Sequence, residues 1–144
     1  MKDITINQLI FSYNKSVPLI KCSHLSFKPG NIYALVGPNG SGKTTFLKLL
    51  LGLLKPSEGT IIGIADSRIA FVPDYNGLYE SLSVLENIKF RLSLYNRAYK
   101  NEKQYVFELL SKYKLQNEEN KLVRDLSLGM KKKVALICAM AVNP

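Results

Sequence analysis

The stretch VGPNGSGKTT, residues 36–45, constrains the fold of this chain more than any other feature. It fits the pattern G-x-x-x-x-G-K-[ST], in which glycines let successive backbone N–H groups point inward at phosphate oxygens. The lysine of this pattern can reach the β- and γ-phosphates, and the hydroxyl that follows it can bind Mg²⁺. A chance match at four fixed positions is expected on the order of once per few hundred chains. The sequence therefore predicts a phosphate-binding loop.

The segments on either side of the loop support this interpretation. Asn31 to Val36 (NIYALV) is a nearly continuous apolar run, as in a strand buried on both faces of a parallel sheet. After the loop, TTFLKLLLGLL carries leucines on almost every side, so we expect a buried helix that ends near Gly52. Residues 68–72 predict another apolar strand, which is closed by Pro73.

The rest of the chain divides into a strand-rich first half and a helical second half. Extended segments are predicted over 4–11 and about 17–27. From Leu82 to Leu115 the apolar residues fall at helical spacing, with residues 100–103 as the polar link between two helices. We expect an α/β core with the phosphate loop over 1–74, a helical subdomain over about 75–127, and a final helix with its preceding turn over 126–144.

Composition excludes several classes of protein. The 144 residues suffice for one domain, and 47% hydrophobic with 22% charged residues is typical of a globular chain. The net charge of +9 favours an anionic partner. Cys22 and Cys138 belong to no CxxC or Cys/His cluster, which argues against a zinc site or a disulfide framework. The N-terminus is not a signal peptide, and the apolar run 134–142 is far short of the roughly 20 residues that span a bilayer.

A second anion site is predicted near the end of the chain. Ser127 precedes an apolar helix and is a good N-cap residue. Residues 126–129 (LSLG) therefore place a hydroxyl, an open backbone and the positive end of a helix together. Two complementary sites that are too far apart to share one ligand suggest that two copies pair head to tail. The alternative is a plain helix cap that holds no ligand.

Four stretches of the sequence resemble the ATP-binding subunits of ABC transporters. They are Tyr13, FKPGNIYALVGPNGSGKTTFLKLLLGLLKPSEGTI, FVPDYNGLYESLSVLENI and LSLGMKKKVALICAMAVNP. The last of these resembles the LSGGQ signature and its helix. The resemblance implies a P-loop NTPase fold of the ABC type, with a parallel core sheet, N-terminal antiparallel strands and a helical subdomain. It also implies ATP and Mg²⁺ as ligands.

The resemblance also assigns roles to individual residues. Lys43 and Asp74 would be catalytic, and Thr44 and Asp74 would bind the metal. Asp74 stands where the family has a glutamine, and the alternative is a solvated turn aspartate. Tyr13 would stack on adenine. The full nucleotide-binding set comprises Tyr13, Val17, Gly37, Pro38, Asn39, Gly40, Ser41, Gly42, Lys43, Thr44, Thr45, Ser127 and Gly129.

The sequence also departs from the family pattern. Leu128 replaces the first signature glycine, and we expect this to be tolerated. The link from Gly59 to Phe71 is short, so the β-subdomain is expected to be trimmed. The sequence stops at Asn143-Pro144, where the family continues into a strand with the Walker B carboxylates, and His24 precedes the loop and cannot be the family's switch histidine. We therefore expect a truncated or fragmentary domain that is inactive alone.

The resemblance implies a membrane permease and a second ATP-binding subunit as partners, on the cytoplasmic face of the membrane. The SLGM and E-N patterns favour an exporter-type system. The alternatives are a non-hydrolysing nucleotide-binding module and a nucleic-acid-associated ATPase of the same class. Lys131 to Lys133 and residues 97–103 are the candidate basic patches for nucleic acid, although a solvated helix face is the favoured interpretation. Phosphoryl-transfer kinases rank last because they lack LSLGM.

Overall fold

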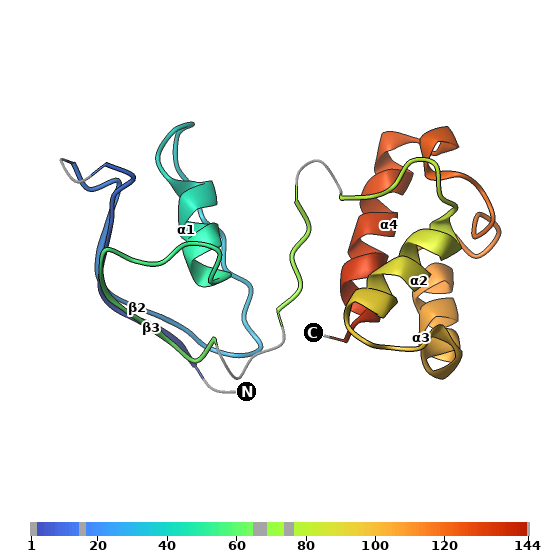
Figure 1. The fold of residues 1–144 in the computed structure, drawn as a ribbon, viewed down its shortest axis with the longest axis horizontal. Helices are drawn as coiled ribbons and strands as arrows, with labels where there is room; N and C mark the ends of the chain where they lie inside the picture. Colours follow the sequence, from blue (N-terminus) through green and yellow to red (C-terminus); the bar gives the residue numbers. More distant parts are fainter. Residues whose placement is uncertain (1–2, 15–16, 65–68, 74–76, 144) are drawn as a thin grey trace. The chain divides into compact units, whose positions relative to one another are not determined.

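The structure is a computed structural model that describes residues 3–14, 17–64, 69–73 and 77–143. The chain divides into two compact units, Met1–Ile69 and Ala70–Pro144. We call them the sheet unit and the helical unit, and each contains its own cluster of buried hydrophobic residues. Figure 1 shows the first from blue to green and the second from light green to red.

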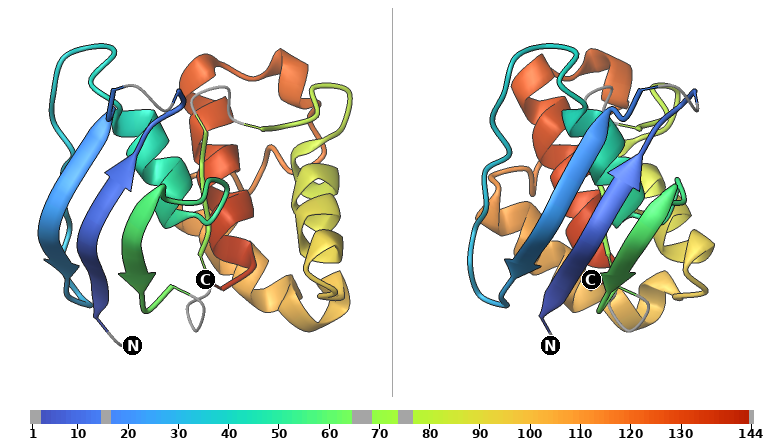
Figure 2. Two further views of the ribbon diagram at one scale, coloured as in Figure 1. Left: turned by 60° about the vertical axis from the view of Figure 1, so that its left-hand side comes forward. Right: turned by 90° about the vertical axis from the view of Figure 1, so that its left-hand side faces the viewer.

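The sheet unit is built on three antiparallel strands in the order β2-β1-β3. They are β1 (Ile4–Phe11), β2 (Ile20–Phe27) and β3 (Glu58–Ile62). The first two were predicted from alternation, and they pair in register from Ile4 opposite Phe27 to Phe11 opposite Ile20. One helix, α1 (Lys43–Leu50), lies against one face of the sheet (Figure 2). The core between them consists of Ile6, Leu9, Phe11, Phe46 and Leu49.

The pairing of β1 with β3 is irregular and requires a glycine. The register shifts between Asn7 and Ile10, and Gln8 between them has a φ of 49°. Opposite this shift, Gly59 has a φ of 83°, and a Cβ at this position would collide with the carbonyl oxygen of Gln8. Only glycine combines this backbone conformation with so close an approach.

The predicted strand over Asn31 to Val36 does not form. These residues belong to no strand, and their side chains are exposed, with Ile32 at 100% and Val36 at 88%. A strand needs at least one neighbouring strand to pair its backbone groups, and within the described ranges residues 31–36 have no such neighbour. The described part of the second predicted strand, residues 69–72, is likewise not a strand. The antiparallel strands are thus confirmed, whereas the parallel sheet is not present among the described residues.

Helix α1 is buried on one side only, so the prediction of an all-round buried helix is wrong. Thr45, Phe46 and Leu49 face the sheet, while Leu47 is 41% exposed. The sheet covers one face, and nothing in the described part of the unit covers the other. The end of the helix at Gly52 is confirmed: with a φ of 69° this glycine donates to the carbonyl of Leu49, and Leu53 donates to that of Lys48.

In its described residues, the helical unit contains three α-helices and one short 3₁₀ turn. They are α2 (Val84–Leu94), α3 (Tyr99–Lys112), η1 (Val123–Asp125) and α4 (Leu128–Ala141). The predicted apolar stripes meet in the core, and the start of the last helix at Leu128 is confirmed. The fully buried members of this core, each 0% exposed, are Val84, Ile88, Leu92, Val106, Val134, Ile137 and Ala141.

The predicted link between the first two of these helices is misplaced. Residues 100–103 lie in the first turn of α3, and the link is instead residues 95–98. Three of the four residues 100–103 are exposed on the helix surface. All four are polar, so in the sequence they resemble a loop. The real turn contains Asn96 at a φ of 55°, a conformation that asparagine adopts more readily than most residues.

The first turn of α2 is held by the segment that follows α3. The amide of Val84 donates to the carbonyl of Lys121, and that of Leu85 donates to the carbonyl of Glu119. The N-terminal amides of α2 are therefore occupied by backbone rather than open to a ligand. No helix within the described ranges has the length and apolar character needed to cross a membrane.

Candidate functional site

The loop of residues 36–45 curls back on itself before α1. Gly40 and Gly42 have φ values of 82° and 90°, which are left-handed conformations that favour glycine. The amide of Ser41 donates to the carbonyl of Pro38 at 3.3 Å, and the amide of Phe46 donates to that of Gly42 at 2.8 Å. The loop therefore ends in a left-handed residue from which the helix starts directly.

The side chain of Lys43 folds back over this loop. Its Nζ donates to the carbonyl oxygens of Gly37 and Pro38, each at 2.8 Å. The ammonium group thus lies beside the first residues of the loop, although Lys43 itself is the first residue of the helix. This position brings a full positive charge to the first residues of the loop.

The start of α1 leaves backbone donors without a protein partner. Gly42 precedes the helix and provides no side-chain cap. Among the described residues, no acceptor bonds the amides of Lys43, Thr44 or Thr45. Unpaired first-turn amides and the helix dipole both favour an anion at this place.

The loop borders a hollow of about 370 Å³ within the sheet unit. Its walls come from the loop, from Phe46 and from Leu19, Ile20 and Lys21 at the start of β2. Gly37 lines it as well, and a Cβ at Gly37 would lie 2.9 Å from the Oγ of Ser41. The absence of a side chain at Gly37 therefore keeps the turn tight.

The remaining predicted nucleotide contacts of the sheet unit differ in their exposure and in their distance from the loop. The hydroxyl of Tyr13 lies 3.1 Å from Thr45 Oγ1, so the end of β1 reaches the first turn of α1. The Tyr13 ring is 61% exposed and packs edge-on against Phe11, with 5.0 Å between ring centroids. Val17 and Thr44 are exposed. Asp74 lies outside the described residues.

Ser127 is the N-cap of α4, as predicted. Its Oγ accepts from the amide of Met130 at 3.3 Å, and its carbonyl accepts from the amide of Lys131 at 2.9 Å. Within the described ranges, the amides of Leu128 and Gly129 have no acceptor. Leu128 is 65% exposed and does not have a positive φ, so the backbone here does not require the glycine that Leu128 replaces. We call residues 126–129 the signature turn.

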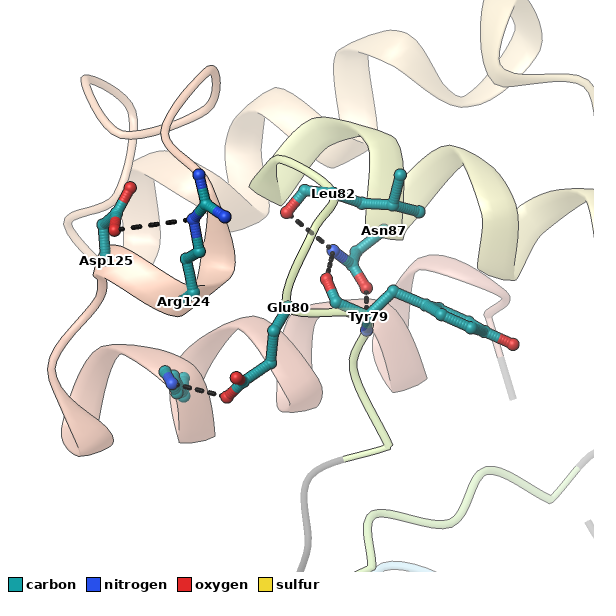
Figure 3. Close-up of polar contacts among 7 residues, drawn as sticks. Tyr79, Glu80, Leu82, Asn87, Arg124 and Asp125 are labelled. Carbon is teal, nitrogen blue, oxygen red and sulfur yellow. Dashed lines mark hydrogen bonds and ion pairs between the residues drawn. The ribbon is translucent and has the colours of Figure 1, made fainter.

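Sequence reasoning missed two polar contacts beside the signature turn. Asn87 is 3% exposed, and its side-chain amide bonds the backbone of Tyr79 and Leu82 (Figure 3). It also donates to the carbonyl of Ser83. Lys131 was expected on a solvated face, but its Nζ lies 2.7 Å from Glu80 Oε1. The E-N pair was visible in the sequence, yet nothing in the helical periodicity marks Asn87 as buried.

Metal-binding side chains are sparse. In the part of the chain that the structure describes, no group of three His, Cys, Asp or Glu side chains could hold a metal ion. His24 lies in β2 with its Nδ1 2.8 Å from Asn7 Oδ1. The described protein side chains therefore provide no complete metal site of their own.

Comparison with known proteins gives consistent relatives. Residues 20–144 match the family described as ABC transporter. The chain is 39% identical over 128 residues to the SkfA peptide export ATP-binding protein SkfE of Bacillus subtilis, covering 81% of this chain and 53% of that protein. It is 32% identical over 141 residues to the zinc import ATP-binding protein ZnuC of Buchnera aphidicola, covering 98% of this chain and 57% of that protein. The chain thus spans about half the length of these relatives.

Solved structures agree with this assignment. A putative ABC transporter ATP-binding protein from Pyrococcus furiosus is 30% identical with a TM-score of 0.83, over 99% of this chain and 72% of that one. A structure described as the ATP binding subunit of an ABC transporter is 25% identical with a TM-score of 0.83, over 99% and 63%. The predicted P-loop NTPase fold of the ABC type is confirmed. The chain therefore belongs to the ABC transporter family and matches that family's ATP-binding subunits.

Proposed function

We propose that this chain binds the phosphates of ATP at residues 36–45 and serves as the nucleotide-binding part of an ABC transporter. The observation that carries the proposal is the position of Lys43, whose ammonium lies over the loop beside the open amides of the α1 N-terminus. A charged amine and several inward backbone donors together are the arrangement that a polyphosphate needs. Family membership supports the choice of ATP.

The residues present fit a nucleotide phosphate. Gly37 leaves no side chain inside the turn, and the donors of the loop are amides and an ammonium, with no carboxylate among the residues that line the hollow. Residues 37–45, including Asn39 and Ser41, would hold the phosphates, and the exposed Tyr13 ring would stack on the base beside Val17. When bound, ATP supplies the phosphoanhydride bond that an ABC transporter uses as its energy source.

The fit for Mg²⁺ is partial. Thr44 offers an exposed hydroxyl at the first turn of α1, which suits a hard cation as a single oxygen ligand. The other ligands would be phosphate oxygens and water, as is usual for this ion beside a nucleotide. Asp74 remains our candidate for a further ligand and for a catalytic role beside Lys43.

Two partners complete the proposed function. The signature turn offers a second anion site through the amides of Leu128 and Gly129. We propose that Ser127 and Gly129 of one copy close over the nucleotide on the loop of another. The named relatives serve peptide export and zinc import, so both directions of transport occur among them. The higher identity to the exporter subunit supports export, with a membrane permease as partner and the cytoplasmic face as location.

The test is a pair of lysine variants on one helix. Lys43→Ala removes the ammonium from the loop, and Lys48→Ala removes an exposed lysine from the last turn of α1. Titration calorimetry with Mg·ATP should show at least about tenfold weaker binding for Lys43→Ala, since a hydrogen bond to a charged group contributes about 1.5–3 kcal/mol. Lys48→Ala should bind like the wild type. Equal affinity of the wild type and Lys43→Ala would remove the basis of the proposal.

A further inference from the structure

Glu80 and Lys131 connect two distant parts of the helical unit. Glu80 lies in the segment before α2, and Lys131 lies in the first turns of α4, 51 positions later. Their side chains meet at 2.7 Å, and the Lys131 side chain is only 20% exposed although it is a lysine. Figure 3 shows the Glu80 carboxylate directed at α4.

The Glu80 end of this contact is fixed by its surroundings. The carbonyl of Glu80 accepts from the amide of Arg124 at 3.1 Å. The preceding residue, Tyr79, is held on both its amide and its carbonyl by the buried side chain of Asn87. Exposed ion pairs are weak mainly because both side chains must be ordered from a mobile state. The Glu80 side chain is 65% exposed, so these contacts fix the position of its backbone, from which the carboxylate reaches Lys131.

The Lys131 end is joined directly to the signature turn. The amide of Lys131 donates to the carbonyl of Ser127, which closes the first turn of α4. The first turn of α4 contains no acidic residue, and three lysines follow at 131–133. Positive charges near a helix N-terminus are unfavourable, and Glu80 supplies the missing negative charge from another segment.

We infer that Glu80 and Lys131 act as positioning residues that hold the first turn of α4, and with it the open amides of Leu128 and Gly129, against the segment of residues 79–82. The inference rests on the proposed role of the signature turn as an anion site. It adds that the orientation of this turn depends on a charge pair outside the turn itself.

The first experiment measures the protection of the first turn of α4 in the absence of nucleotide. Glu80→Gln and Lys131→Gln break the pair, and Lys132→Gln is the matched control, because Lys132 is exposed on the next position of the same helix. Amide hydrogen exchange by NMR on the full 144-residue chain should be about two- to fivefold faster at Met130 and Lys131 in both broken variants. Exchange at Leu92 in the core of α2 should stay unchanged, which shows that the unit is folded.

Charge reversal separates positioning from simple loss of packing. The double variant Glu80→Lys, Lys131→Glu should restore most of the protection, whereas each single reversal should not. Added salt should speed exchange at Met130 in the wild type and leave it unchanged in Glu80→Gln. The inference is overturned if the broken variants exchange like the wild type, or if Lys132→Gln has the same effect as Lys131→Gln.

The second experiment measures the proposed function of the signature turn, which is nucleotide-dependent association of two copies. Sedimentation with and without Mg·ATP should show weaker nucleotide-dependent self-association for Glu80→Gln, in the same direction as Ser127→Ala, while Mg·ATP affinity at the loop is unchanged. Wild-type protein that binds Mg·ATP without associating would contradict the head-to-tail pairing of the proposed function. The exchange data would still decide the positioning role, so the two failures can be distinguished.

Discussion

Asn87 shows how one side chain organises the turn before α2. Its Oδ1 accepts from the amide of Tyr79 at 2.8 Å, and its Nδ2 donates to three carbonyls, those of Tyr79, Leu82 and Ser83. An amide group has two N–H donors, so one of these hydrogens is shared between two acceptors. The side chain replaces the hydrogen bonds that a regular element would have given this backbone. The segment can therefore be irregular although Asn87 and Ser83 beside it are buried.

Asn87→Ala should destabilise the helical unit by about 1–3 kcal/mol, because it leaves buried backbone groups without partners. The free energy of unfolding is measured by urea titration with circular dichroism at the helix band. Asn101→Ala is the control, since Asn101 is an exposed asparagine on α3. Unchanged stability of Asn87→Ala would mean that water satisfies the same groups.

At the scale of single residues, the sequence predicts which side chains belong to a binding motif better than it predicts which side chains are buried or paired. The pattern G-x-x-x-x-G-K-[ST] places Lys43 at the loop because the motif itself encodes a backbone path. Asn87 and Lys131 carry no comparable pattern. Their roles depend on which segments the fold brings beside them, and helical spacing alone counts both as surface residues.

Helix ends are the element-level features that the sequence predicts best. Ser127 as an N-cap and Gly52 as a stop signal depend only on the nearest few residues, and both are present as expected. The strand over 31–36 is the opposite case, because a strand is defined by partners that are distant in the sequence. The first turn of α3 was missed because Ala98, which precedes it, makes no side-chain cap.

The start of α2 should respond to pH through its capping box. The amide of Ser83 donates to Glu86 Oε2 at 2.7 Å, and this bond is the main cause that lowers the pKa of Glu86 below its ordinary value of 4.5. The unfolded chain then binds a proton at higher pH than the folded chain does. The stabilisation is therefore complete above pH 4.5 and is lost as the pH falls through the folded-state pKa.

Glu86→Gln removes this titration while keeping a side chain that can accept the same bond. Unfolding free energies of the helical unit measured from neutral pH down to about pH 3 should decline less for Glu86→Gln than for the wild type. A wild-type slope in Glu86→Gln would show that the capping bond does not couple to protonation.

At the scale of the whole molecule, each unit carries one cysteine in a different environment. Cys22 lies half-buried on β2 of the sheet unit, and Cys138 is 1% exposed in the core of the helical unit. Burial raises the pKa of the Cys138 thiol to about 12. The reactive thiolate is thereby suppressed by about a thousandfold relative to an ordinary thiol with a pKa of 9.0.

Thiol labelling should therefore report on the two units separately. At about pH 8, Ellman's reagent should modify Cys22 in native protein, whereas Cys138 should react only as urea unfolds the helical unit. The variants Cys22→Ser and Cys138→Ala assign the two reactions. Native-state labelling of Cys138 at the rate of Cys22 would contradict the buried core described here.

Residues 31–36 bear on the affinity of the loop for the proposed nucleotide. They lead directly into Gly37, and their backbone donors and acceptors have no ladder partner within the described ranges. A chain segment that pairs with these residues as a strand would also fix the position of the backbone that enters the loop. Where strand addition favours nucleotide binding at the proposed site, thermodynamic reciprocity requires that nucleotide binding favour strand addition by the same factor. With nucleotide bound as proposed, completion of the sheet and binding of the ligand would be linked equilibria.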